Sequence, residues 1–362
     1  MRYILQEESV KHLRIPLSKI ELATNKLTEK YLGAGAYGEV YEAELEVALD
    51  KSEIPTKRTV AIKCIIDSGA GKEGFYTEIE LLTSCKHDNI VSLLGICDEG
   101  PHMILVYEYA SNKSLDNYLG GSPDNSINLT WIQRLKIAVD IAKGLNYLHT
   151  RVKDEHVEDE HKIIHRDLKS GNILLGDNWV AKIADFGLSK FNRVNEEGKT
   201  FYTGTIAGTP EYTCPEYKRT GRLKRQIDIY SLGVVLFEIL SGKLAYDRIF
   251  DEGNETGIAH VARRRFKDGT INDMVDQKIM EEVDELTSTL NKGPNQESLE
   301  TFIEIALKCI EESQDKRPKA KEVMEKLEEA LSFQIFCAGC DWYTSIGENH
   351  QILELLDYIQ TI

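Results

Sequence analysis

The stretch that decides the fold is IIHRDLKSGNILLGDNWVAKIADFG, residues 163–187. Its first half is a tight polar loop in which Asp167 and Asn172 stand five apart, with Lys169 between them. A carboxylate in such a loop can orient a hydroxyl group and accept its proton. An ammonium group can face a phosphoryl group during transfer, and an amide oxygen can bind a metal ion. The coincidence of these polar residue types indicates a catalytic loop.

The second half of this stretch ends in a candidate metal ligand. Asp185 follows the apolar run 179–184 and precedes Phe186 and Gly187. A carboxylate at the end of a strand is a hard oxygen ligand suited to Mg²⁺. The tripeptide Asp-Phe-Gly occurs by chance in many proteins. It indicates a metal site here only together with the catalytic loop that precedes it.

A glycine-rich turn lies far upstream, at Gly33, Gly35 and Gly38. Glycines let the backbone fold closely over a polyanion, with N–H groups facing the phosphate oxygens. Dinucleotide-binding folds use a similar spacing, but there the turn opens a helix. Here the strand-like run 40–43 follows, which favours a hairpin lying over a nucleotide.

A lysine ends the next apolar strand. Lys63 closes the alternating run VAIK, residues 60–63, and can meet phosphates on one face of the strand. Burial of its charge requires a carboxylate partner. Glu78 on the predicted helix 74–84 is the best placed candidate, and an exposed edge-strand lysine is the alternative for this segment taken alone.

The chain changes character near residue 110. Before it, short β-prone runs surround one helix, and after it helical periodicity dominates, ending in a predicted helix over 320–333. The charged connector between His149 and Lys162 is interpreted as a solvated loop, and 185–225 as a long functional loop. Residues 1–28 are polar, with one short helix expected after an N-cap at Ser18.

Composition narrows the class of protein. The 362 residues hold 44 Lys plus Arg and 60 Asp plus Glu, a net charge of −16, which argues against nucleic acid as a partner. The seven cysteines are scattered and suggest no disulfide framework. No apolar run has the length of a transmembrane segment, so a cytoplasmic chain is expected.

Taken in order, the glycine turn, VAIK, the helix glutamate, H-R-D-L-K-x-x-N and D-F-G resemble the signature of the eukaryotic protein kinases. Cys214-Pro215-Glu216 stands where that family has A-P-E, and Arg317 resembles the late arginine that pairs with Glu216. The stretches IPLSKIELATNKLTEKYLGAGAYGEVYEAEL and HDNIVSLLGICDEGPHMILVYEYASNKSLDNYL are similar to the plant receptor-like and receptor-like cytoplasmic Ser/Thr kinases.

The resemblance implies an α+β, bilobal kinase fold with a small, mostly antiparallel-sheet N-lobe and a larger helical C-lobe. It places a flanking segment at 1–28 and a kinase domain at 29–333, with the N-lobe at about 29–109 and the C-lobe at about 110–333. Residues 334–362 are then a C-terminal tail whose role is not readable.

The resemblance also implies ATP and Mg²⁺ as cofactors and assigns roles to residues. Asp167, Lys169, Lys63 and Glu78 are the expected catalytic residues, and Asn172 and Asp185 the expected metal ligands. The expected nucleotide contacts share one cleft and are Gly33, Gly35, Gly38, Val40, Ala61, Lys63, Tyr107 (the gatekeeper), Glu108, Ala110 and Leu174.

Specificity and regulation follow from the same resemblance. Lys169 and Thr209 are typical of Ser/Thr rather than Tyr kinases. Arg166 is the expected sensor of a phosphate on the activation loop, with Thr200, Thr203 and Thr205 as candidates. The stretch PEYTC, residues 210–214, departs from receptor-like relatives, which leaves the sequence preference for substrates open.

The predicted function is transfer of the γ-phosphoryl group of Mg·ATP to Ser/Thr hydroxyls of proteins in receptor-linked signalling. The expected partners are protein substrates and a membrane receptor or co-receptor, with a place in the cytoplasm or peripherally at the plasma membrane. The alternative is a pseudokinase-type scaffold or binding module, which usually lacks the catalytic Asp, the metal Asp or the strand Lys.

Overall fold

Apolar runs between residues 31 and 108 build a five-stranded antiparallel sheet. The computed structural model describes residues 8–35, 38–48, 53–120, 127–150, 152–153, 160–193, 201–203, 205–252, 255–281 and 293–340. The sheet has the order β1-β2-β3-β5-β4. Its strands are β1 (Tyr31–Gly35), β2 (Gly38–Val47), β3 (Thr56–Ile65), β4 (Leu93–Cys97) and β5 (Ile104–Glu108).

Helix α3 (Gly69–Ser84) packs against this sheet and completes the small lobe. It begins five residues before the predicted start, because the Ser68 side chain caps it by accepting the Gly71 N–H at 3.0 Å. Phe75, Ile79 and Leu82 form the predicted buried face, and Glu78 is buried beside them.

The N-terminal segment lies on the small lobe. It forms α1 (Glu8–Lys11) and α2 (Leu17–Ala23), and between them Ile15 N–H donates to Ile96 O at 2.9 Å. Ile20 is fully buried in one cluster with strand residues of β2, β3, β4 and β5. The expected cap at Ser18 is wrong, because α2 begins after Pro16 and no side chain caps it.

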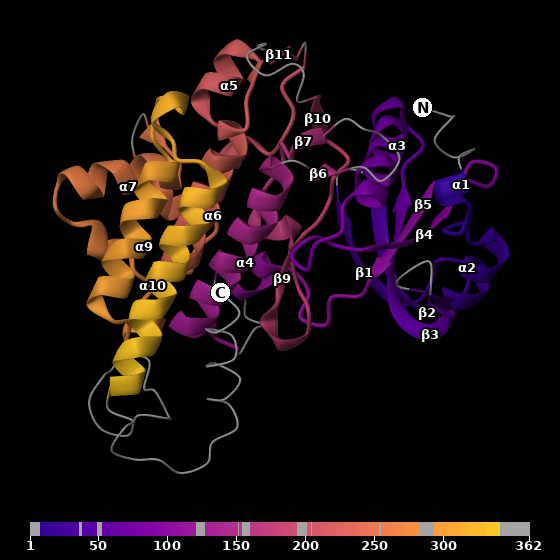
Figure 1. Cartoon of the computed structure of the whole chain (residues 1–362), viewed down its shortest axis with the longest axis horizontal. Helices are drawn as coiled ribbons and strands as arrows, with labels where there is room; N and C mark the ends of the chain where they lie inside the picture. The colour runs from indigo at the N-terminus through magenta and orange to yellow at the C-terminus, as the bar shows by residue number, and fades with distance from the viewer. Residues whose placement is uncertain are drawn as a thin grey trace.

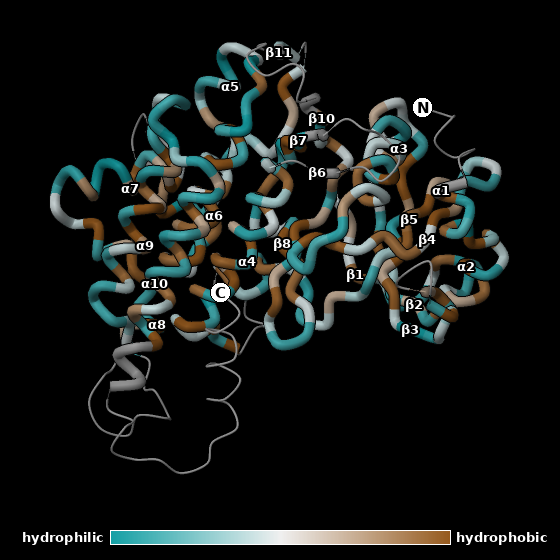
Figure 2. The backbone as a smooth tube through the Cα atoms, in the orientation of Figure 1, coloured by the Kyte–Doolittle hydropathy of each residue, from teal (hydrophilic) through white to brown (hydrophobic). Residues whose placement is uncertain are grey.

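The large lobe is helical, and Figure 1 shows it on the opposite side from the sheet. Its helices are α4 (Trp131–His149), α5 (Pro215–Thr220), α6 (Gln226–Ser241), α7 (Ile258–Lys267), α8 (Gln277–Met280), α9 (Gln296–Cys309) and α10 (Ala320–Cys340). Helix α6 is apolar on nearly all sides and therefore fully buried, with α4, α7 and α9 packed against it. In Figure 2 the tube is mostly brown along α6 and teal over α5, which borders solvent.

Helix α4 starts with a reciprocal cap. Thr130 accepts the Gln133 N–H, and the Gln133 side chain accepts the Thr130 N–H. Helix α10 continues past the predicted end at Phe333 as far as Cys340, so residues 334–340 of the expected tail are helical. The rest of that tail, 341–362, lies outside the described residues.

Both stretches interpreted as loops contain regular structure. Part of the connector after His149 forms β6 (Val152–Lys153) and β7 (Glu160–Ile164), while 154–159 lies outside the described residues. Strand β7 pairs with β10 (Lys190–Arg193), far along the chain. Strands β6, β7 and β10 are too short to show the alternation of apolar and polar residues from which a strand is predicted.

Short strands and 3₁₀ turns lie in the segments that connect the longer helices and strands. Three further strand pairs are β8 (Ile173–Leu175) with β9 (Ala181–Ile183), β11 (Phe201–Tyr202) with β12 (Arg222–Leu223), and β13 (Asp251–Glu252) with β14 (Glu255–Thr256). The 3₁₀ turns are η2 (Leu115–Tyr118), η3 (Ser170–Asn172), η4 (Asp177–Trp179), η6 (Pro210–Tyr212), η7 (Arg248–Phe250), η8 (Ile271–Met274) and η9 (Gln314–Lys316). Within the described ranges, no helix combines the length and the apolarity that a membrane crossing requires.

Candidate active site

The strand lysine meets two carboxylates where the lobes face each other. Lys63 Nζ donates to Glu78 Oε2 at 3.1 Å and to Asp185 Oδ1 at 2.7 Å. Burial lowers the pKa of Lys63, but the charges of Glu78 and Asp185 outweigh it, so the net shift is upward. The predicted partner Glu78 is confirmed, and the contact with Asp185 joins residues 122 positions apart.

Glu78 also holds the start of the D-F-G segment. Its Oε1 accepts the Phe186 N–H at 3.1 Å, so one carboxylate binds both Lys63 and the backbone after Asp185. The charge of Lys63 keeps the pKa of Asp185 below its usual value, although burial alone would raise it. Asp185 is therefore ionised at neutral pH and able to bind a cation.

The Asp167 carboxylate in the catalytic loop is held by hydrogen bonds from Thr209 and from Asn172. Asp167 Oδ1 accepts the Thr209 N–H at 2.8 Å and the Thr209 hydroxyl at 2.7 Å. Asn172 Nδ2 donates to the Asp167 carbonyl at 2.8 Å and lies 3.3 Å from its Oδ2. Lys169 Nζ reaches Thr209 Oγ1 at 3.1 Å. These bonds orient the Asp167 carboxylate.

Strand pairing brings Asn172 and Asp185 together. In the β8–β9 pair Ile173 lies opposite Ile183, and the Ala184 N–H donates to Asn172 O at 2.9 Å. Asn172 and Asp185 offer an amide and a carboxylate oxygen, the hard donors that Mg²⁺ prefers while water and phosphate supply its other ligands. The two residues thus fit the expected metal, although the described residues hold no cluster of three or more His, Cys, Asp or Glu that would bind a metal alone.

The glycine turn has open space at two of its three glycines. A Cβ on Gly33 or Gly35 would meet nothing within 4 Å, whereas one on Gly38 would lie 2.0 Å from Cys64 O. Packing therefore requires glycine at 38, and at 33 and 35 the backbone faces open space. The tip of the turn, Ala36 and Tyr37, lies outside the described residues.

Most of the remaining nucleotide candidates lie on neighbouring strands of the small lobe and on β8 of the large lobe. Val40 lies opposite Lys63 in the β2–β3 register, and Ala61 lies opposite Tyr107 in the β3–β5 register. Leu174 forms an isolated bridge with Ser114, just after Ala110. The Tyr107 ring is buried, which raises the pKa of its hydroxyl, and that hydroxyl has no hydrogen-bond partner among the described residues.

Glu108 has a role that its position in the sequence did not suggest. Its carboxylate accepts Lys182 Nζ at 2.8 and 2.9 Å and the Ser92 N–H at 2.7 Å. Lys182 lies on β9 of the large lobe, so the side chain of Glu108 ties the two lobes together. Glu108 and Lys182 are 74 positions apart in the sequence, so no local sequence pattern predicts their contact.

Asp228 is a second residue whose role was missed. It is fully buried on α6 and accepts the N–H groups of His165 and Arg166 at 2.8 and 2.9 Å, and it also lies 2.8 Å from His149 Nε2. Hydrogen bonds and the charge of His149 lower its pKa against the opposing effect of burial. The sequence feature that could have revealed this role is an aspartate within an apolar helix, because a buried charge requires polar partners.

Arg166 reaches the activation segment. Its guanidinium donates to Tyr217 Oη at 2.8 Å, to Leu188 O at 3.0 Å and to Thr205 O at 3.4 Å. Thr203 Oγ1 lies 3.3 Å from the same Tyr217 hydroxyl. The guanidinium thus contacts the backbone of Thr205 and shares the Tyr217 hydroxyl with Thr203, while Thr200 lies outside the described residues.

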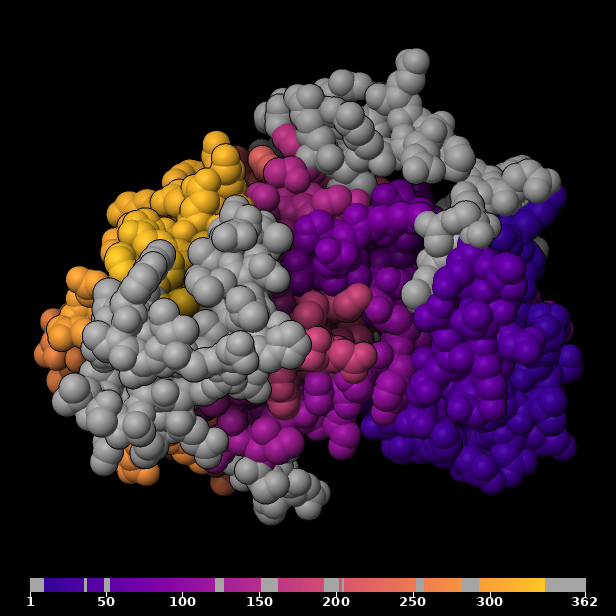
Figure 3. All heavy atoms as spheres, turned by 60° about the horizontal axis from the view of Figure 1, so that its bottom comes forward, coloured from indigo at the N-terminus to yellow at the C-terminus, as the bar shows by residue number. Residues whose placement is uncertain are grey.

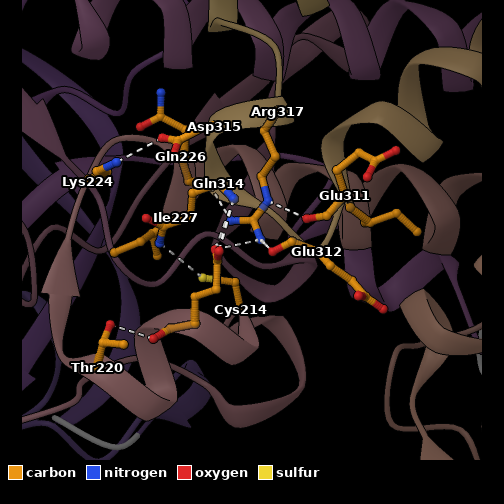
Figure 4. A network of polar contacts seen from close by, with 12 residues as sticks. Cys214, Thr220, Lys224, Gln226, Ile227, Glu311, Glu312, Gln314, Asp315 and Arg317 are labelled. Atoms are coloured by element: carbon orange, nitrogen blue, oxygen red, sulfur yellow. Dashed lines mark hydrogen bonds and ion pairs between the residues drawn. The ribbon is translucent and has the colours of Figure 1, made fainter.

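In the large lobe, the buried side chain of Arg317 holds the end of the activation segment in place (Figure 4). Arg317 donates to the carbonyl groups of Glu311, Glu312 and Gln226 and lies 3.3 Å from Glu216 Oε2. The predicted pairing of Arg317 with Glu216 is confirmed. It anchors α5 to the helical core.

The space-filling view in Figure 3 shows the violet small lobe beside the magenta and rose atoms of the middle of the chain, which carry the catalytic loop and the D-F-G segment. Three separate parts of the sequence thus meet at the junction of the lobes and bring together the expected site residues Lys63, Asp167, Asn172 and Asp185.

Comparisons with known proteins agree with this architecture. A profile of the family described as "Protein tyrosine and serine/threonine kinase" matches residues 27–327. "Receptor-like protein kinase HERK 1" from Arabidopsis thaliana is 37% identical over 322 residues, which are 89% of this chain and 35% of that protein. "Probable LRR receptor-like serine/threonine-protein kinase At1g67720" from the same plant is 38% identical over 331 residues, 91% of this chain and 32% of that protein. The chain spans about a third of the length of these relatives. It belongs to the protein tyrosine and serine/threonine kinase family.

Proposed function

We propose that the chain is an ATP- and Mg²⁺-dependent protein Ser/Thr kinase. The observation that carries the proposal is the convergence of the Lys63–Glu78–Asp185 contacts with the oriented carboxylate of Asp167. Phosphoryl transfer requires alignment of the nucleophile and stabilisation of spreading charge more than covalent chemistry. This arrangement supplies both.

Each residue has a task in this proposal. Asp167 orients the hydroxyl of the substrate and accepts its proton, and Lys169 faces the transferred group. Lys63, held by Glu78, contacts the α- and β-phosphates, and the glycine turn covers them. Asn172 and Asp185 would hold Mg²⁺, which would supply positive charge to neutralise the phosphates.

The adenine base would lie between Val40 and Ala61 on one side and Leu174 on the other, beside the gatekeeper Tyr107. Its polar edge would meet the backbone of residues 108 and 110. The open space at Gly33 and Gly35 supports this placement, since side chains there would occupy the approach to the phosphates.

Ser/Thr specificity is part of the proposal. Lys169 and Thr209 contact each other and Asp167, so both lie where the hydroxyl of a substrate must enter. The printed name of the relative "Probable LRR receptor-like serine/threonine-protein kinase At1g67720" supports the same specificity. Action on proteins in receptor-linked signalling, with a receptor or co-receptor partner and a cytoplasmic location, is proposed on the receptor-like names of the relatives.

The test is transfer of labelled phosphate from ATP to a generic Ser/Thr protein substrate, with and without Mg²⁺. Lys63→Met removes the ammonium group that Glu78 and Asp185 hold, and we expect the rate to fall about 10²-fold or more. Lys308→Met is the matched control, because Lys308 is a surface lysine that pairs with Glu304 on α9. A wild type no faster than Lys63→Met would favour the scaffold function instead.

Regulation by the activation segment is proposed with it. A phosphate on Thr203 or Thr205 adds about −1.5 to −2 charge beside Arg166 and would order the segment. We expect that replacing Thr200, Thr203 and Thr205 together by Ala abolishes activation by preincubation with Mg·ATP. Mass spectrometry of the preincubated wild type would show which threonine is modified, and an unchanged rate in the triple variant would contradict the idea.

A further inference from the structure

A run of positive charge lies at the end of the activation segment. Residues 218–225, KRTGRLKR, hold five Lys or Arg and no acidic residue, in a chain whose net charge is −16. The run begins in the last turn of α5 and continues through β12. Basic residues in the last turn of a helix complement the helix dipole, which accounts for the first two. The helix dipole does not account for the cations that follow the helix.

The first two cations of the run have no partner within the part of the chain that the structure describes. The side chains of Lys218 and Arg219 are exposed, and neither forms a hydrogen bond or an ion pair with a described residue. Other exposed lysines pair with a carboxylate, as Lys57 does with Glu44. The charges of Lys218 and Arg219 are therefore available to a ligand.

Two further cations lie close by, and one carboxylate faces both. Lys224 Nζ donates to Asp315 Oδ1 at 3.0 Å. This hydrogen bond and the charge of Lys224 lower the pKa of Asp315, and the charge of Arg222 on β12 adds to the effect. Lys218, Arg219, Arg222 and Lys224 are called the α5 patch below. Their positive charge exceeds that of the single carboxylate.

An exposed aromatic ring adjoins the α5 patch. Tyr202 on β11 lies opposite Arg222 in the β11–β12 pair and is 70% exposed. Side chains of directly opposed residues in an antiparallel pair share one face. The surface thus offers a partner both charge and an apolar contact, a combination suited to a segment of protein.

The α5 patch is held close to the catalytic loop. Tyr217, next to Lys218 on α5, accepts an N–H from Arg166 at 2.8 Å, and Arg166 precedes Asp167. Figure 1 shows α5 and β11 together at the upper edge of the large lobe. A protein whose Ser or Thr reaches Asp167 can therefore place another part of its chain on the patch.

We propose that the α5 patch is a docking site for an acidic segment of the protein substrate, separate from the residues that flank the phosphorylated Ser or Thr. Carboxylates complement its charge, and Tyr202 supplies an apolar contact. A two-fold dimer built on the patch would instead bring like charges together, which is unfavourable. The proposal rests on the proposed kinase function and names a substrate class for it.

The experiment links one acceptor to two kinds of tail. Each peptide carries a Ser flanked by Ala and Gly, a Gly/Ser linker of about 4, 8 or 16 residues, and a tail of about six residues. The tail is either Asp and Glu or the neutral Asn and Gln, placed before or after the Ser. All peptides are assayed with the full chain and Mg·ATP.

We expect the acidic tail to lower KM about 10-fold at the best linker length and to leave kcat unchanged, because docking raises the effective concentration of the acceptor. The advantage should depend on linker length and shrink as salt rises. Equal KM for acidic and neutral tails at every linker length would overturn the proposal.

Charge reversal locates the docking site. Lys218→Glu and Arg219→Glu should each reduce the KM advantage, and the double variant should abolish it, while the neutral-tail peptide keeps its kcat and KM. Lys218→Gln should reduce the advantage less than Lys218→Glu. The control Lys57→Glu reverses an exposed lysine of the small lobe and should keep the full advantage. An advantage that survives the double reversal would refute the α5 patch as the docking site.

A binding arm separates this inference from the kinase proposal. Fluorescence anisotropy of labelled acidic and neutral tails without the Ser, on the full chain, reports docking even where no phosphate is transferred. Tighter binding of the acidic tail without any transfer supports the docking site and contradicts the kinase function. Transfer to both peptides with equal KM contradicts the docking site alone.

Two further measurements address other occupants of the α5 patch. Sedimentation with vesicles that contain an anionic lipid reports a membrane surface, and size-exclusion chromatography of the chain alone reports a second copy. We expect neither to depend on Lys218 and Arg219. Binding to vesicles, or a dimer, that the double variant abolishes while the acidic tail binds no tighter than the neutral one would overturn the proposal.

Discussion

Two residues of the site adopt left-handed backbone conformations that are uncommon outside glycine: Arg166 with φ 72° and Asp185 with φ 66°. Such conformations cost on the order of 1–3 kcal/mol and persist where the surroundings determine them. Here Asp228 holds the N–H groups of His165 and Arg166, and Glu78 holds the N–H group after Asp185. Two buried carboxylates thus fix the backbone on both sides of the reacting groups.

Residue chemistry was partly readable from the sequence. The pairing of Lys63 with Glu78 follows from the need of a buried ammonium group for a carboxylate. The contacts of Glu108 with Lys182 and of Asp228 with His149 were not readable, because each joins residues more than seventy positions apart. Such pairs depend on tertiary packing, which a local pattern does not contain.

A pH-dependent effect on stability is predicted at Asp140 on α4. It accepts the Ala181 N–H at 2.9 Å, and burial raises its pKa to about 6. Between about pH 4 and pH 6 the unfolded chain loses this proton while the folded chain keeps it, so the contribution of Asp140 to stability falls as pH rises, by about 2–3 kcal/mol in all. Asp140→Asn should therefore raise the Tm at pH 7.5 and change it little at pH 4.5. Thermal melts at both values check this, with the exposed Asp315→Asn as control, and a variant equally destabilised at both would contradict it.

At the scale of elements, the docked N-terminal segment shows the limit of periodicity. Ile20, Leu22 and Leu27 predict one short amphipathic helix, but they do not indicate which surface covers it. The structure places Ile15 against Gly95, where an added Cβ would lie 2.2 Å from the Ile15 side chain. Ile15 can therefore pack against β4 because Gly95 has no side chain. The β6–β7–β10 sheet was missed for a related reason, since strands of two to five residues carry too little alternation.

The segment should stabilise the small lobe. Ile20→Ala removes a fully buried side chain and should lower the free energy of unfolding by about 2–5 kcal/mol. Leu22→Ala on the same helix removes a side chain that is 86% exposed and should change it by less than about 0.5 kcal/mol. Urea denaturation of both variants checks the difference. Equal costs would mean that α2 does not dock as described.

At the scale of the whole molecule, two lobes of different construction meet at charged contacts. Lys63 of the sheet bonds to Asp185 of the large lobe, and Glu108 bonds to Lys182 across the same junction. The resemblance of the ordered motifs to the protein kinase signature predicted this bilobal architecture. The activation segment was less predictable, since its short strands and α5 depend on contacts such as that of Arg317 with Glu216.

The most direct measurement is a single-turnover assay of phosphoryl transfer from Mg·ATP to a Ser-containing protein substrate, with wild type and Asp167→Asn compared at saturating substrate. Asn keeps the shape of the side chain and one oxygen for Thr209, but it cannot accept the hydroxyl proton. We predict a rate about 10²–10⁴-fold lower for Asp167→Asn, with thermal stability unchanged and Asp315→Asn equal to wild type. Equal rates for wild type and Asp167→Asn would contradict the assignment of Asp167, and with it the account of the site.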